Sequence, residues 1–170
     1  ALSTLDIKDC FHRLIMPEEM SSLFCFPIPV QAGTLGLVGA TVDGKTLRSC
    51  DLVFPCSRCF PMGFSWSLYV CQRVAEQQVA NCVSMRNSEL LHDRSRSLVI
   101  GGCDPSNLRR HYVYVDNIGI FRPKARDTSR AQHEIGSRLT SLGMLTHDEE
   151  TSVGRTEVLG DLLDLKDHFS

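Results

Sequence analysis

Apolar residues follow clear periods along this chain, and the most regular stretch spans residues 111–121. Its sequence, His-Tyr-Val-Tyr-Val-Asp-Asn-Ile-Gly-Ile-Phe, places β-branched and aromatic residues on both sides of an Asp-Asn pair. Such residues suit a pleated, half-buried surface, and Asp and Asn tolerate the backbone angles of a hairpin turn. The pattern predicts two short strands with Asp116 at the corner. Taken alone, the stretch is most simply explained as an ordinary β-hairpin that needs no chemistry.

Shorter patterns place strands before and after this hairpin. Leu5 and Ile7 flank Asp6, so a strand there presents the acid on the face opposite its apolar neighbours. Pro17 and the two glutamates that follow it predict a turn or the first turn of a short helix. Further strands are predicted at residues 22–30, 34–42 and 46–54, which form an antiparallel group, at 97–100 within a long loop over 86–110, and at 157–163.

Two helices are predicted from apolar residues at helical spacing. The first runs from about Ser65 to Val83, and the second is capped by Asp127 or Ser129 and stops at Gly143. The residues expected to be buried are Cys71, Ala75, Val79 and Cys82 in the first helix, and Ala131, Ile135, Leu139 and Leu142 in the second. The order of elements predicts an α+β fold, in which two helices pack on one face of an antiparallel sheet that carries a β-rich insertion.

Composition limits the classes of protein that the chain can represent. Its 170 residues are 42% hydrophobic and 22% charged, which is typical of one globular core and excludes a disordered chain. The net charge of -2 excludes a generally basic, nucleic-acid-coating surface, although arginines cluster near residues 94–110 and 122–130. No stretch has the length of a membrane span or the pattern of a signal peptide. Localisation stays open, with the interior of the cell as the default.

The eight cysteines are expected to be reduced thiols. Most lie in apolar segments of a domain large enough to fold without disulfides. One Cys-x-x-Cys joins Cys56 to Cys59, but no second cysteine pair or Cys-His partner follows at the spacing of a structural zinc site. A metal at these cysteines is therefore not expected.

Two acids, Asp6 and Asp116, are predicted to lie on neighbouring central strands. Two close carboxylates repel each other unless cations lie between them, and hard divalent ions prefer oxygen ligands. Two magnesium ions roughly 3.5–4 Å apart can hold both the attacking and the leaving oxygen of a phosphoryl transfer. The acid pair therefore raises the possibility of two-metal chemistry.

Five segments in order resemble the signatures of retroelement reverse transcriptases. They are residues 5–11 (Leu-Asp-Ile-Lys-Asp-Cys-Phe), 60–67 (Phe-Pro-Met-Gly-Phe-Ser-Trp-Ser), 114–117 (Tyr-Val-Asp-Asn), 142–144 (Leu-Gly-Met) and 158–160 (Val-Leu-Gly). The first three are the more specific, and all five fall on the strand, helix and hairpin positions predicted above. The resemblance implies a reverse transcriptase palm and the activity of an RNA-directed DNA polymerase.

The resemblance also implies a domain plan. The chain is expected to be a single reverse transcriptase domain over 1–170, with a palm at about 1–21 and 60–170 and a fingers-like β insertion at about 22–59. Because it starts at the first signature and stops near the fifth, part of the fingers, the thumb and ribonuclease H are expected to lie elsewhere in a parent polyprotein. The implied partners are an RNA or DNA template with its primer and deoxynucleoside triphosphates, with no membrane.

Family signatures imply specific roles at the first and third segments. Asp6 and Asp116 would bind two Mg²⁺ or Mn²⁺ ions, and the Ile7 carbonyl would add a ligand. Main-chain N–H groups of Asp9 and Cys10 would hold the triphosphate of the nucleotide.

Other matched positions would contact the nucleotide or the template. Phe11 matches the aromatic gate that packs under the sugar and excludes a 2′-hydroxyl, although a plain core phenylalanine is the alternative. Met62 and Gly63 would lie at the nascent base pair, where glycine lets the backbone approach closely. The positions implied for contact with template or primer are Phe64, Gln72 and Tyr114.

Three departures from the family pattern keep a second function open. Asn117 replaces the second acid of the third signature, so it offers a neutral amide in the catalytic set. Met62 replaces a residue that is polar in retroviral members. A lysine expected near the fourth signature is missing, and the neighbouring His147 is predicted to be a surface histidine. The alternative to a polymerase is a palm fold that binds nucleic acid or protein without catalysis.

Overall fold

A computed structural model of the chain describes residues 1–92 and 108–165. Its main feature is a five-stranded sheet with the order β6-β7-β8-β1-β9. The strands are β1 (Leu2–Ile7), β6 (Glu89–Leu91), β7 (Arg110–Tyr114), β8 (Asn117–Phe121) and β9 (Thr146–Ser152). Neighbours are antiparallel except for β6 and β7, which pair in parallel. The predicted antiparallel sheet is thus confirmed for β7, β8 and β1, and β9 adds a strand that was not predicted.

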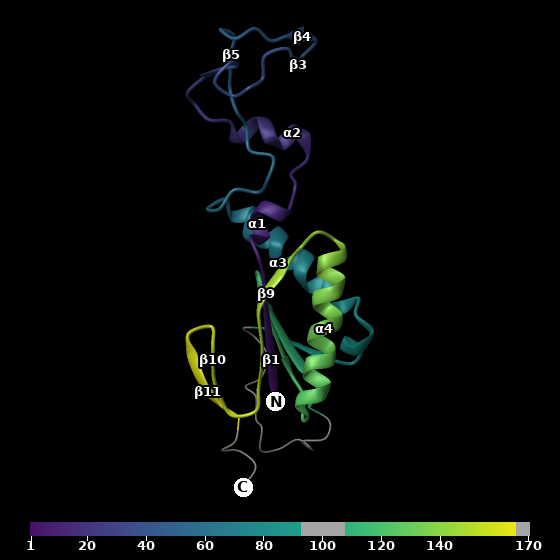
Figure 1. Cartoon of the computed structure of the whole chain (residues 1–170). Coiled ribbons are helices and arrows are strands. Elements are labelled where there is room, and N and C mark those ends of the chain that lie inside the picture. The colour runs from purple at the N-terminus through teal and green to yellow at the C-terminus, as the bar shows by residue number, and fades with distance from the viewer. Residues whose placement is uncertain (93–107, 166–170) are drawn as a thin grey trace.

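Two long helices cover one face of this sheet (Figure 1). The helices are α1 (Cys10–Arg13), α2 (Glu18–Ser21), α3 (Ser65–Ala80) and α4 (Ala125–Ser141), and the 3-10 turns are η1 (Ser22–Phe24) and η2 (Val83–Met85). α3 packs on β7 and α4 packs on β1, β8 and β9, while the two helices also contact each other. The predicted α+β arrangement with two helices on one face is confirmed.

The core lies between these helices and the sheet. Leu5 and Ile7 of β1 are almost completely buried there, because alternate residues of a strand point to the same face. The helices contribute the predicted residues at helical spacing, namely Cys71, Ala75, Val79, Ala131, Ile135 and Leu139. Burial of this continuous apolar face fixes the strands against the helices and thereby fixes the loops at their ends.

On the opposite face of the sheet a second, smaller cluster forms. Leu2, Phe121 and Val158 are buried in it, and Tyr112 packs against them. Gly119 lies opposite Tyr112 in the ladder, and a Cβ at this glycine would overlap the tyrosine ring. A glycine is therefore required in β8, where the alternation of bulky residues is interrupted.

Three full strands predicted between residues 22 and 54 are not present. The segment forms two very short pairs instead, β2 (Val30–Gln31) with β5 (Leu52–Val53) and β3 (Thr41–Val42) with β4 (Lys45–Thr46). Pro27 and Pro29 lack the N–H groups that a ladder needs, and several glycines bend the backbone. The insertion extends away from the sheet (Figure 1), so its apolar residues have no second layer to pack against.

The prediction that all cysteines are reduced is wrong. Cys25 and Cys56 form a disulfide across an isolated bridge within the insertion. Pairing of cysteines 31 residues apart cannot be deduced from spacing alone. The other cysteines in the described residues are free thiols.

Helix boundaries agree with the predictions less closely than the buried faces do. α3 ends at Ala80, and Val83 belongs to η2. α4 begins at Ala125, two residues before Asp127 and four before Ser129, and its N-cap residue Lys124 makes no side-chain cap. Leu142 is exposed, because the helix has ended before it, whereas Gly143 has a positive φ of 80° and stops the helix as predicted.

Some strands were missed or misjudged. β9 was not predicted, because its polar sequence lacks an apolar face, yet it pairs with β1 along the sheet edge. β6 was missed within the predicted loop, and the strand expected at 97–100 lies outside the described residues. The strand predicted at 157–163 is a hairpin of β10 (Arg155–Val158) and β11 (Asp161–Asp164). Leu159 and Gly160 both have positive φ at its turn, as a type I′ turn requires.

The described helices include none that is long and apolar enough to cross a membrane. The predicted short helix after Pro17 is confirmed as α2, with both glutamates in its first turn.

His111 makes the stability of the fold dependent on pH. It lies on β7 at 6% exposure beside Ser88, and burial together with the nearby Arg122 charge lowers its pKa to about 4. The unfolded chain, with an ordinary histidine pKa of about 6.5, binds the proton more readily. The contribution of neutral His111 to the free energy of unfolding is therefore fully present above pH 6.5. It is lost as the pH drops toward 4, by about 2 kcal/mol between pH 7 and 5.

Chemical denaturation at pH 7 and pH 5 measures this loss. His111→Leu should reduce the difference between the two pH values, whereas replacement of the exposed His133 by glutamine should leave it unchanged. An equal pH dependence in His111→Leu and the parent chain would contradict the assignment.

Candidate active site

Two predicted acids meet at one end of the sheet. Asp6 lies near the end of β1, and Asp116 lies in the two-residue turn that joins β7 to β8. Asn117, the first residue of β8, is paired with Asp6 in the ladder, and the Ile7 N–H donates to the Asp116 carbonyl at 2.9 Å. The predicted hairpin and the predicted proximity of the two acid-bearing segments are therefore confirmed.

Backbone strain in this turn is located at Val115. This residue has φ of 58°, whereas Asp116 and Asn117 do not have positive φ. A β-branched residue in the left-handed region is unusual and costs on the order of 1–3 kcal/mol. The expectation that the Asp-Asn pair takes the unusual backbone angles is wrong. This turn has a positive φ only at its first central position, and that residue is Val115.

Gln72 holds the strained turn from α3. Its side-chain nitrogen donates to the Val113 carbonyl at 2.7 Å, and its side-chain oxygen accepts the Val115 N–H at 2.7 Å. The same amide nitrogen also lies 2.8 Å from the carboxylate of Glu76, one helical turn further along α3. The helix therefore fixes the backbone on both sides of Tyr114, which a reading of the sequence did not reveal.

Asp6 carries an unfavourable charge in this setting. Partial burial and the nearby Asp116 carboxylate raise its pKa, while His147 acts in the opposite direction. His147 Nε2 lies 3.0 Å from Asp6 Oδ1, and its Nδ1 lies 2.7 Å from Asp148 Oδ2. The prediction that His147 is a surface histidine is therefore incomplete. Strand β9, which was not predicted, places His147 opposite Asp6 in the sheet.

Asn117 interacts directly with the second acid. Its amide nitrogen donates to Asp116 Oδ1 at 3.1 Å, so this hydrogen bond occupies one oxygen that a metal ion could use. The two carboxylates and the amide oxygen are hard ligands that suit a divalent cation, which would also relieve the repulsion at Asp6. Within residues 1–92 and 108–165, however, no three Asp, Glu, His or Cys side chains form a metal-binding group. The donor chemistry fits Mg²⁺ or Mn²⁺ with two charged ligands.

Comparison with protein families shows the family of the chain that carries this site. The sequence model of the reverse transcriptase (RNA-dependent DNA polymerase) family matches residues 1–160. The chain belongs to the reverse transcriptase family. A search of curated proteins gave no match. The five-stranded sheet with its helices is consistent with the palm-type fold that this family implies, with Asp6 on β1 and Asp116 in the turn between β7 and β8.

Residues that the reverse transcriptase signatures assign to the nucleotide lie directly after β1. Asp9 has φ of 55° and is the N-cap residue of α1, and Cys10 is buried, with a thiol pKa raised by burial. Phe11 is half-buried and packs against the main core cluster. That packing is compatible with a core phenylalanine as well as with a sugar gate.

The second signature lies at the base of the insertion and at the start of α3. Met62 is 73% exposed and lines a pocket there together with Phe24, whose ring meets Phe64 edge-on at 4.9 Å. Gly63 has φ of 90° with open space beside its Cα, so the loop leaves room for a close approach. Tyr114 is 60% exposed next to the turn. These residues lie on separate elements, and their roles stay predictions.

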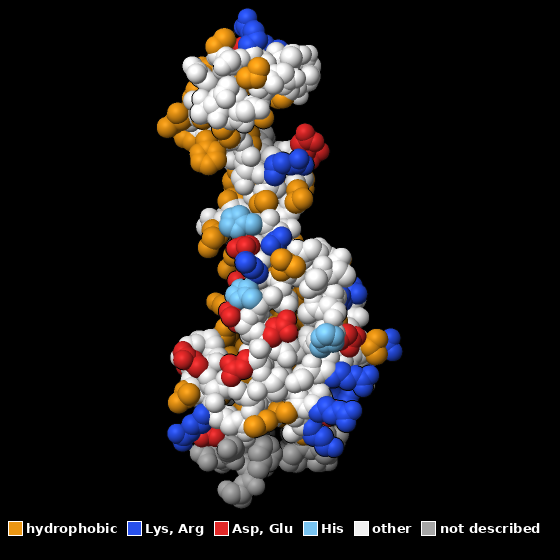
Figure 2. Space-filling view, viewed as in Figure 1, with side chains coloured by type: hydrophobic (Ala, Val, Ile, Leu, Met, Phe, Trp, Pro, Cys, Tyr) orange, Lys and Arg blue, Asp and Glu red, His pale blue; other side chains and the backbone are white. Residues whose placement is uncertain are grey.

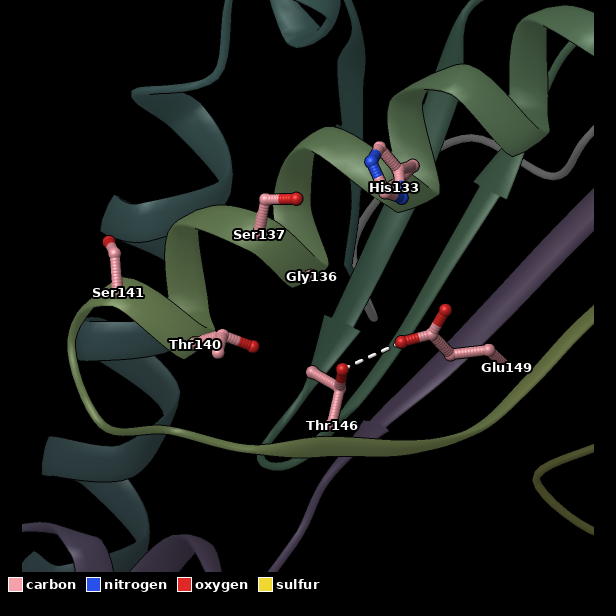
Figure 3. A pocket seen from close by; sticks show the side chains of 7 residues that line it. All are labelled: His133, Gly136, Ser137, Thr140, Ser141, Thr146 and Glu149. Atoms are coloured by element: carbon pink, nitrogen blue, oxygen red, sulfur yellow. Dashed lines mark hydrogen bonds between the residues drawn. The ribbon is translucent and has the colours of Figure 1, made fainter.

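A groove lies between α4 and the strand β9 (Figure 3). Its volume is about 480 Å³, and Gly136 of α4 lines it opposite the side chains of Thr146 and Glu149. Thr146 donates a 2.7 Å hydrogen bond to Glu149 on the groove floor. Alternation along β9 turns Thr146 toward α4 and His147 toward Asp6, so the groove and the acids occupy opposite faces.

Proposed function

We propose that the chain is the palm of an RNA-directed DNA polymerase that extends a primer by nucleotidyl transfer. The observation that supports this most directly is the meeting of Asp6 and Asp116 at the end of adjacent strands. In this proposal residues of about 1–21 and 60–170 form the palm, and about 22–59 form a fingers-like insertion. Template, primer and deoxynucleoside triphosphates are the substrates.

Asp6 and Asp116 would hold Mg²⁺ or Mn²⁺, with the Ile7 carbonyl as a further ligand. Such ions polarise phosphoryl oxygens and stabilise the charge that develops on them. Gln72 positions the turn that carries Asp116, so the α3 helix preorganises the acid. Within the same proposal, main-chain N–H groups at Asp9 and Cys10 hold the triphosphate.

Further roles in this proposal concern the nucleotide sugar and the template. Phe11 would exclude a ribose hydroxyl, and Met62 with Gly63 would border the new base pair. Phe64 and Tyr114 would contact the template or primer. For Gln72, the two bonds to the turn support a positioning role instead of direct template contact.

A second candidate function is nucleic-acid binding without catalysis. Asn117 supports it, because the site has an amide where the family signature has a carboxylate, and that amide bonds to Asp116. His147 supports it as well, because it occupies one oxygen of Asp6.

Primer extension on an RNA template with Mg²⁺ or Mn²⁺ tests the polymerase proposal. Extension should require the metal and should fall by about 100-fold or more in Asp6→Asn, since a ligand charge is lost. Asp43→Asn removes the same charge from an exposed turn of the insertion and should leave the rate unchanged. Absence of extension with retained template binding would favour the second candidate.

A further inference from the structure

A third pocket lies at the end of the sheet opposite the acids. It has a volume of about 610 Å³ and lies between η2, the end of β8 and the start of α4. Its lining residues include four cations, Arg109, Arg122, Lys124 and Arg130, and two acids, Asp127 and Glu134. Lys and Arg side chains gather over the first turns of α4 in Figure 2. From Asp116 to Arg122 the chain advances six residues, or roughly 20 Å along β8.

Among the described residues, Arg122 is a buried charge that forms no ion pair with a carboxylate. It is only 4% exposed, and its guanidinium donates to the Phe121 carbonyl at 2.9 Å and to the Ser88 hydroxyl at 3.2 Å. Burial, and then the nearby Arg109, lower its pKa. A buried cation is normally paired with an anion, because desolvation is costly. Here the guanidinium is held by neutral groups, and Asp127 acts on its charge only from beyond ion-pair distance.

Exposed cations around the pocket are also unpaired. Within the described part of the chain, Arg109, Lys124 and Arg130 form no ion pair with a carboxylate. Glu134, the nearest candidate partner, accepts the backbone N–H groups of Val83 at 2.6 Å and Ser84 at 3.0 Å. The acid is therefore engaged by η2, and the pocket keeps a net positive charge of two from four cations and two acids.

Two neutral features of the pocket also favour an anion. The Ser84 hydroxyl oxygen is shielded from solvent and, among the described residues, has no hydrogen-bond partner. α4 begins at the pocket without a side-chain cap, so the positive end of its dipole adds to the cations. An anion with several oxygens could accept from guanidinium, ammonium and hydroxyl groups together.

We propose that this pocket binds a phosphate of a single-stranded nucleic acid outside the catalytic groove. Guanidinium groups match phosphate oxygens, and three exposed cations around one buried arginine suit a strand whose neighbouring phosphates pass the rim. The choice of nucleic acid over a free anion rests on membership of the reverse transcriptase family. Binding at the pocket does not require catalysis. The pocket would therefore serve either candidate function as a second attachment point for template.

Binding of a labelled single-stranded RNA, measured by anisotropy over a range of salt concentrations, tests this proposal. Lys124→Ala and Arg130→Ala should each weaken binding about fivefold and reduce the slope of log affinity against log salt by about 0.7. Arg126→Ala is the matched control, because this exposed arginine lies on the same helix but does not line the pocket. It should change neither quantity.

Hydrogen exchange locates the bound strand. RNA should protect the peptide that covers residues 122–130, and this protection should disappear in Lys124→Ala while protection near residues 114–117 persists. Protection of residues 122–130 without any protection near 114–117 in the parent chain would count against the polymerase site and leave the pocket supported. Equal weakening in all three variants would overturn the proposal as a general charge effect. Protection of 122–130 by pyrophosphate but not by RNA would also overturn it.

Discussion

Gln72→Leu is expected to destabilise the fold by about 2–4 kcal/mol and to disorder the turn that carries Asp116. The substitution keeps the size of the side chain but removes both bonds to the backbone of Val113 and Val115. Each buried backbone group left without a partner costs about 1–3 kcal/mol. The effect is large because Val115 is buried with φ of 58°, so the turn depends on outside support for its strained backbone.

Urea denaturation gives the stability change, and amide exchange at residues 113–117 reports the turn. Gln77→Leu is the matched control, since this glutamine lies on the exposed side of the same helix. It should change stability by less than about 0.5 kcal/mol. Gln72→Glu should fall between the two, because a carboxylate can still accept from Val115 but cannot donate to Val113. Unchanged exchange at the turn in Gln72→Leu would refute the positioning role.

Asn117→Asp is expected to raise Mg²⁺ or Mn²⁺ affinity by about tenfold or more and to lower stability in the absence of metal by on the order of 1–2 kcal/mol. The amide that donates to Asp116 would become a third carboxylate beside it and opposite Asp6 in the ladder. Three like charges repel without a cation and offer an additional charged ligand with one. The two effects therefore have opposite signs and the same cause.

Calorimetric metal titration and thermal melts in chelator measure these two effects on the chain itself. Asn117→Ala removes the bond to Asp116 without adding charge, so it should lower stability without raising metal affinity. Equal affinity in Asn117→Asp and the parent chain would mean that Asn117 does not face a metal site. Stabilisation of Asn117→Asp in chelator would contradict the proposed repulsion.

His147 connects these predictions to the edge of the sheet. It lies 3.0 Å from Asp6, on a strand whose charged sequence shows no apolar alternation. A metal at Asp6 would have to compete with this contact. The family lysine was expected near this position, so the histidine contact is a difference between this chain and the family pattern.

Local pattern alone determined the hairpin, both long helices and the acids at the ends of the central strands. Apolar residues in these elements recur at the spacing that burial on one face requires, as Leu5, Ile7, Ala131 and Ile135 show. Family membership followed from the same segments, because the signatures lie on them. These features depend on neighbours a few residues apart, which a sequence displays directly.

Only the tertiary structure decided which distant groups meet. The bonds of Gln72 to the turn, the contact of His147 with Asp6 and the Cys25–Cys56 disulfide join residues 31 or more positions apart. The insertion failed as a set of strands because its apolar residues extend away from any second layer, and that geometry is not encoded in their alternation. Strand β9 formed from a polar sequence because β1 offered it a free edge, so pairing with a neighbour overrode local preference.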